Sequence, residues 1–131
     1  MALDYQIDAV NRIVTITGDY TDGAGWRTLL TAVAGDPDYR RGFGFLRDVR
    51  SSEHPVDAAT VMGIIAVVRE FWDVLGVTRA AILTRRTVDN AAVMAHALAE
   101  EEHLAIRAFN SYEDAVRWLQ GNLRIGSSAR D

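Results

Sequence analysis

The amino-acid sequence predicts a single α/β domain, in which helices pack on a mixed, mostly parallel five-stranded sheet. Segments with an apolar period of two alternate with segments whose period is near that of a helix, in the order β-β-α-β-α-β-α-β-α. The length of 131 residues suffices for one hydrophobic core. We expect residues 1–123 to form the domain and residues 124–131 to form a disordered C-terminal tail.

The N-terminal segments predict a β-hairpin followed by a helix. Leu3–Asp8 and Arg12–Thr17 alternate apolar and polar side chains, and a short link separates them. A turn around Thr21–Gly23 follows the hairpin, and the next helix ends at Gly35. The apolar stripe of this helix consists of Trp26, Leu29, Leu30 and Val33.

The middle of the chain predicts two buried strands joined by a long helix. Phe43–Val49 is mostly apolar and indicates the third strand. A helix is expected from about Val56 to Leu75, with Gly76 as its C-terminal stop. The short apolar run Ala80–Leu83 is typical of a central parallel strand.

The remaining segments predict a helix, a strand and a final helix. Thr87 is expected to cap a helix that ends near Glu101, and Leu104–Phe109 supplies the last strand. Ser111 begins the final helix in a pattern similar to a capping box. The buried side of that helix consists of Ala115, Trp118 and Leu119.

Composition excludes several classes of chemistry. The chain has no cysteine, which removes disulfides, thiolate nucleophiles and cysteine zinc sites and favours a cytoplasmic location. It has no lysine, which removes Schiff-base chemistry and the usual lysine phosphate-binding loop. The net charge of −4, without a long basic run, argues against a nucleic-acid partner. No apolar run approaches the roughly 20 residues of a membrane span.

The long helix has a wider apolar face than packing on a sheet requires. Its apolar residues spread over about half of the circumference, whereas a stripe of roughly 100° suffices. Either a neighbouring helix covers the surplus, or the helix forms a protein–protein contact, most simply in a symmetric homodimer. The candidate interface residues are Val61, Ile64, Ile65, Val68, Phe71 and Trp72.

Polar side chains gather at the predicted sheet edge where the parallel strands end, which is where open α/β sheets bind ligands. Asp48, Ser51 and Ser52 follow the third strand, and Arg85 and Thr87 follow the fourth. Together they could hold an anion, a phosphorylated serine or a partner protein. Alternatively, the serines occupy a loop, Thr87 caps a helix and the arginine is solvated.

No motif assigns a catalytic residue, a cofactor or a metal ion. His96 shares a helical stripe with Asp89 and Glu100, but the spacing matches no established metal pattern and a solvated helix flank explains it. The chain lacks a Gly-x-Ser-x-Gly elbow and a dinucleotide fingerprint. An enzyme built on Asp48, a serine and Arg85 is a third hypothesis, without a recognisable acid–base pair.

Three segments together resemble a known family: Phe43–Val49, Ala80–Leu83 and Arg107–Leu119. Their order is similar to that of the STAS-like family related to anti-sigma-factor antagonists (SpoIIAA-like), including its uncharacterised bacterial branch. The resemblance covers nearly the whole chain in element order. The final strand and helix are its sharpest part, and they are specific to the fold rather than to a function.

The resemblance implies a non-enzymatic regulatory module that binds a partner protein or itself. In classical members a serine in the loop after the third strand is phosphorylated, and the partner is an anti-sigma kinase. The corresponding loop holds Asp48, Ser51 and Ser52, followed by Glu53–Pro55 where the family has small, glycine-rich residues. Lipid-binding relatives imply the alternative of a small apolar ligand held between helix and sheet. We expect its cavity near Phe43, Phe45, Trp72 and Met94.

Overall fold

The computed structural model describes residues 3–18, 22–51, 57–85 and 90–121. In these residues the chain forms five strands and four helices, in the predicted order. Their bounds are β1 Asp4–Asp8, β2 Ile13–Thr17, α1 Gly23–Ala34, β3 Gly44–Asp48, α2 Ala58–Leu75, β4 Ala80–Leu83, α3 Asn90–Glu101, β5 Ile106–Phe109 and α4 Tyr112–Leu119.

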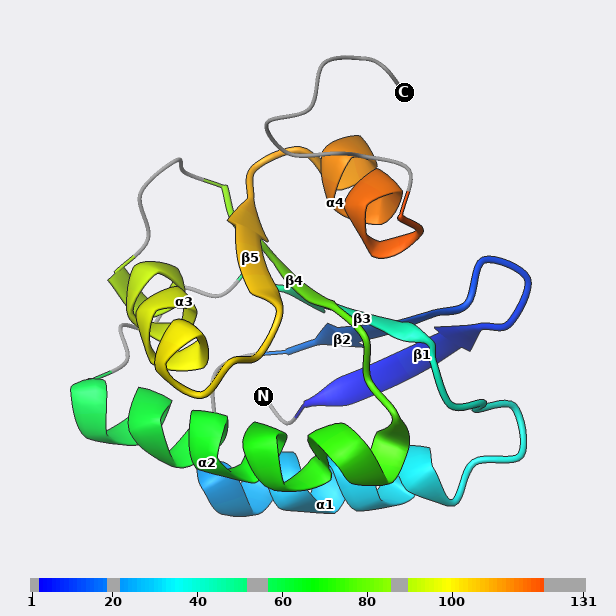
Figure 1. The fold of residues 1–131 in the computed structure, drawn as a ribbon, viewed down its shortest axis with the longest axis horizontal. Coiled ribbons are helices and arrows are strands. Elements are labelled where there is room, and N and C mark those ends of the chain that lie inside the picture. The colour runs from blue at the N-terminus through cyan, green and yellow to red at the C-terminus, as the bar shows by residue number, and fades with distance from the viewer. Residues whose placement is uncertain (1–2, 19–21, 52–56, 86–89, 122–131) are drawn as a thin grey trace.

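The strands form one sheet in the sequential order β1-β2-β3-β4-β5. β1 and β2 are antiparallel, and each later strand is parallel to the strand before it. The predicted α/β class and the mixed, mostly parallel sheet are therefore confirmed. Figure 1 shows α1, α2 and α3 on one face of the sheet and α4 on the other.

The strand order explains why three helices share one face. Each crossover from β2 to β5 steps to the next strand in the same direction, and crossovers of one hand then place their helices on the same side. α2 consequently lies between α1 and α3 and packs against both. α1 and α3 cover part of the apolar face of α2, whereas Met62 and Val74 of the same helix are exposed.

Local hydrogen bonds shift two element boundaries from their predicted positions. α2 begins at Ala58 because the side chain of Asp57 accepts a hydrogen bond from the Thr60 amide at 2.8 Å and caps the helix. β5 begins at Ile106 because the Leu104 amide donates to the Ala99 carbonyl oxygen at 2.8 Å, within the turn that ends α3. The predicted cap Thr87 lies outside the described residues.

The buried side chains form three clusters, one on the α4 face and two on the opposite face. The α4 cluster packs Trp118 and Leu119 against Leu46 and Leu83 of the sheet. On the other face, one cluster lies beneath α1 and α2 and a second lies beneath α2 and α3. α2 therefore spans the boundary between two parts of the core. No helix in the described part of the chain is long and apolar enough to cross a bilayer.

Side chains of the loop before β3 hold the C-terminal end of α2. The Tyr39 hydroxyl donates to the Leu75 carbonyl oxygen at 2.6 Å. Arg41 donates to the carbonyl oxygens of Asp73 and Val74, both at 2.9 Å. These bonds satisfy carbonyl groups that have no partner within the helix, and the arginine charge suits the negative end of the helix dipole. Burial raises the pKa of Tyr39 to about 12, so its hydroxyl remains a donor well above neutral pH.

Gly76 is the backbone position on which this helix end depends, and substitution by alanine tests it. Gly76 has a φ of 66°, and a Cβ atom there would lie 2.9 Å from Cζ of Arg41. We expect Gly76→Ala to lower the free energy of unfolding by about 1–2 kcal/mol, because a left-handed conformation strains an L-residue. Urea denaturation would measure this change.

Gly63, within α2, provides a matched control. A Cβ atom at Gly63 meets nothing within 4 Å. Gly63→Ala is therefore expected to raise the free energy of unfolding by about 0.5–1 kcal/mol, the usual gain in a helix interior. A Gly76→Ala variant as stable as the parent would contradict this account of the helix end.

Candidate functional site

The described residues line an apolar cavity of about 100 Å³ between α2 and the sheet, which is partly open to solvent. Its lining comes from both core clusters that meet beneath α2, and from all three helices on that face. Apart from Arg47, the lining side chains are aliphatic or aromatic. Water needs two to four polar partners to stay in such a space, so the apolar part of the cavity is dry.

Two cross-strand rows form the floor of the cavity. The first row places Ala80 between Phe45 and Ile106, and the second places Arg47 between Ile16 and Ile82. Side chains in register on adjacent parallel strands point to the same face, so both rows face α2. Ala80 contributes only a methyl group at the centre of its row, which leaves space between its larger neighbours.

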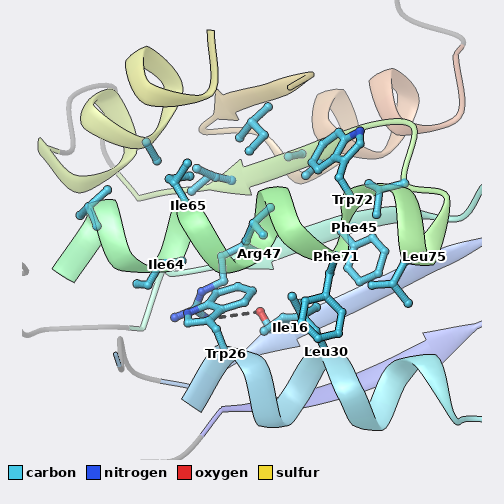
Figure 2. A pocket seen from close by; sticks show the side chains of 18 residues that line it. Ile16, Trp26, Leu30, Phe45, Arg47, Ile64, Ile65, Phe71, Trp72 and Leu75 are labelled. Atoms are coloured by element: carbon cyan, nitrogen blue, oxygen red, sulfur yellow. Dashed lines mark hydrogen bonds between the residues drawn. The ribbon is translucent and has the colours of Figure 1, made fainter. Parts of the chain in front are cut away.

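α2 forms the roof, and α1 and α3 form the walls. Figure 2 shows Ile65 and Trp72 on one side of α2 and Ile64, Phe71 and Leu75 on the other. Six of the residues that line the cavity from α2 are the predicted interface residues: Val61, Ile64, Ile65, Val68, Phe71 and Trp72. Val61, Ile64 and Ile65 are buried, whereas Val68, Phe71 and Trp72 are partly exposed. Self-association through them stays a prediction.

Arg47 is a buried cation in these apolar surroundings. The strand alternation that sends Leu46 toward α4 sends Arg47 beneath α2, where the residue is 7% exposed. Its Nη1 atom donates to the carbonyl oxygens of Ile16 and Asp48, both at 3.4 Å, and Figure 2 shows the bond to Ile16. A buried charge is costly unless other groups compensate it, and these two carbonyl oxygens contribute to that compensation.

Trp26 lies beside Arg47 at the α1 wall. The guanidinium carbon of Arg47 is 5.6 Å from the centre of the Trp26 ring, a cation–π arrangement. Trp26 is 7% exposed, and its Nε1 atom, shut off from solvent, has no hydrogen-bond partner among the described residues. Buried indole N–H groups normally have an acceptor, so this donor is available to a ligand.

An ion pair closes the outer edge between α1 and α2. Both terminal nitrogens of Arg27 contact the carboxylate of Glu70, at 2.5 and 2.9 Å. The Arg27 guanidinium also lies 6.0 Å from the centre of the Phe71 ring, and Phe71 lines the cavity. The pair is exposed, so it contributes little to stability.

The second candidate site, at the sheet edge, is only partly described. Asp48 lies at the end of β3 and is held by Arg50, whose backbone amide, Nε and Nη2 atoms donate to its carboxylate at 3.0, 3.1 and 2.9 Å. Burial opposes ionisation of Asp48, but the hydrogen bonds from Arg50 outweigh it and lower the pKa. Ser51 and Arg85 are exposed, and no ion pair joins Arg85 to Asp48. Ser52 and Thr87 lie outside the described residues.

The histidine stripe on α3 has one observed contact. Nε2 of His96 lies 3.5 Å from a carboxylate oxygen of Glu100, which is largely exposed. Asp89, the third residue of the predicted stripe, lies outside the described residues. In the described part of the chain, no three His, Cys, Asp or Glu residues gather as a metal site would require.

The cavity takes in part of the predicted ligand site and adds two residues that the sequence analysis did not select. Phe45 and Trp72 line the cavity. Phe43 is buried in the core cluster beneath α1 and α2 but does not line the cavity. The side chain of Met94 lies outside the described ones. Arg47 and Trp26 were not selected as site residues. A charged residue inside the apolar run Phe43–Val49 is the sequence signal that could have revealed Arg47.

Comparison with known proteins gives no match: no family model fits the chain, and no curated protein or solved structure is similar to it. The resemblance to the STAS-like family therefore stays a prediction.

The Asp48–Arg50 pair predicts a small, pH-dependent contribution to stability. Because the pKa of Asp48 is lowered in the fold, its contribution is present above the unfolded value of about 4 and is lost as the pH falls through the folded value. We expect Arg50→Met to lower the free energy of unfolding at neutral pH by less than about 1 kcal/mol, since solvent screens the pair. The difference from the parent should shrink as the pH falls below the unfolded value of about 4 and vanish once Asp48 is protonated in the fold.

Arg85→Met is the matched control, because it removes the same charge from the same sheet edge without an ion pair to Asp48. Urea denaturation of the three proteins across the acid range would compare them. A pH-independent effect of Arg50→Met, or an equal effect of Arg85→Met, would refute the assigned pair.

Proposed function

We propose that this chain is a non-enzymatic binding domain that holds a small, mainly apolar ligand between α2 and the sheet. The observation that supports the proposal is the apolar cavity of about 100 Å³ at the junction of two core clusters. Ligand sites are typically apolar spaces with a few polar groups, and Arg47 and Trp26 supply those groups.

The space between α2 and the sheet leaves side chains with fewer contacts than a close-packed interior would give them. Protein interiors are otherwise close-packed, and one larger side chain in place of Ala80 would fill much of the space. A ligand that enters the cavity recovers the lost contacts and stabilises the folded chain by mass action.

The alternative, a STAS-like regulatory module, stays a prediction. Its proposed interface residues on α2 line the interior, and its loop beyond Ser51 is not described. The enzyme hypothesis has no supporting geometry in the described residues, since Asp48 is engaged by Arg50 and not by Arg85. The cavity is the feature that distinguishes the ligand-binding proposal from both.

Intrinsic fluorescence provides a direct test with xenon, cyclopropane and 2-methylpropane as apolar compounds small enough for the cavity. Trp26 and Trp72 line the cavity, whereas Trp118 packs on the opposite face of the sheet. We expect saturable changes in emission and a rise in melting temperature with at least one of these compounds. Absence of both effects for all three would refute the proposal.

Ala80→Val tests whether the binding occurs in this cavity. Two added carbon atoms at the centre of the floor fill part of the space, so we expect at least tenfold weaker binding. The free energy of unfolding should rise by up to about 1.5 kcal/mol, at about 0.8 kcal/mol per buried carbon. Calorimetric titration and urea denaturation measure the two quantities.

Ala108→Val is the matched control, because it makes the same change in an adjacent strand at an exposed position that does not line the cavity. Its ligand affinity should equal that of the parent. Equal losses of affinity in the two variants would place binding elsewhere.

A further inference from the structure

We propose that the ligand of this cavity is a small, uncharged compound with one acceptor oxygen, such as a ketone or an ether, and that this oxygen accepts a hydrogen bond from Nε1 of Trp26. This inference rests on the proposed function and adds the chemistry of the ligand's polar group. Three observations support it: the buried indole donor, the partners that already engage Arg47 and the volume of the cavity.

Trp26 brings a buried hydrogen-bond donor to the α1 wall. It belongs to the buried stripe of α1 and lines the cavity together with Leu30. The residue is 7% exposed, and its Nε1 atom is shut off from solvent and has no acceptor among the described residues. Such a donor is unfavourable, because it has lost its hydrogen bond to water and gained none in exchange. A ligand oxygen that pairs with it removes this penalty, which a pure hydrocarbon cannot do.

The surroundings of Trp26 favour an uncharged acceptor over an ionised one. Arg47 is the charged residue among the described residues that line the cavity, and it already has partners. These include the Trp26 ring and the carbonyl oxygens of Ile16 and Asp48. A carboxylate would therefore lose its hydration without a guanidinium of its own, and an ammonium group would be repelled by Arg47. A carbonyl or ether oxygen is less costly to bury and still accepts from the indole.

The cavity volume limits the rest of the ligand. At about 100 Å³ the space is smaller than the roughly 150 Å³ cavity known to hold benzene, so a compact molecule of about four heavy atoms fits without rearrangement. The rest of the lining is apolar and includes the rings of Phe45 and Trp72, so the remainder of the ligand is hydrocarbon.

The test compares propanone with 2-methylpropene, which has nearly the same shape but carries a methylene group in place of the oxygen. The indole N–H groups of the full, ¹⁵N-labelled chain are followed by NMR as each compound is added. Trp26→Phe removes one indole signal and thereby assigns it. We expect propanone to move the Trp26 signal downfield in a saturable way, because the proton gains an acceptor. 2-Methylpropene should cause no such downfield shift, and neither compound should move the signal of Trp118, on the opposite face of the sheet.

Two tryptophan variants assign the preference to a side chain. Trp26→Phe removes the buried donor, so the ratio of propanone affinity to 2-methylpropene affinity should fall about fivefold, as loss of a buried hydrogen bond predicts. Trp72→Phe is the matched control: it removes an indole from the same lining, but Trp72 is partly exposed and carries no such buried donor. Its ratio should stay within about twofold of that of the parent. Because the two compounds share one shape, a change in cavity volume affects both affinities and cancels in the ratio.

The outcomes separate this inference from the proposed function. If 2-methylpropene binds but propanone does not, or if the two variants change the ratio equally, the acceptor assignment is overturned and the cavity remains a binding site. Failure of propanone, 2-methylpropene and the apolar compounds to bind would overturn the proposed function as well. If Trp26→Phe does not fold, the indole shifts of the parent decide the question: with propanone bound, no indole signal moving downfield overturns the assignment.

Discussion

The packing of α2 against the sheet and against two other helices is the constraint on which the rest of the structure depends. Sequential strand order places α1, α2 and α3 on one face, so the middle helix has apolar neighbours on three sides. Its wide apolar face, too broad for a helix on a sheet alone, matches this position. A cavity remains beneath α2, because the side chains of the two core clusters do not fill the space above Ala80.

The presence of Arg47 in this layer is costly for folding. A methionine or leucine of similar volume would bury there without a desolvation penalty, and such replacements of buried ions are often neutral or stabilising. The stacked Trp26 ring and the carbonyl oxygens of Ile16 and Asp48 contribute to compensating this cost, as a buried cation requires.

The sequence predicted the fold more completely than the site, for identifiable physical reasons. β4 coincides with the predicted Ala80–Leu83, because a short apolar run is a local signal for a buried strand. α2 ends at Gly76 as predicted, because glycine readily adopts the left-handed conformation of a helix end. The wide apolar face of α2 was also apparent from the sequence. How far neighbouring helices cover it depends on the strand order, which the apolar pattern of the sequence does not encode. Arg47 was not selected because β3 is buried on both faces, which hides the alternation that would mark an inward charge. The cavity depends on the register that places Ala80 between Phe45 and Ile106. This register is a property of the tertiary structure that the sequence pattern does not reveal.

The sequential order of the strands also has a consequence for how the molecule assembles. Every strand pairs with its neighbour in the chain, but a helical crossover separates the two strands of each parallel pair, and such non-local pairing is associated with slower folding. Arg47 and Trp26 precede Ala80, Ala95 and Ile106 in the chain, so α1 and β3 are synthesised before β4, α3 and β5. The lining of the cavity is therefore complete only after β5 has been synthesised.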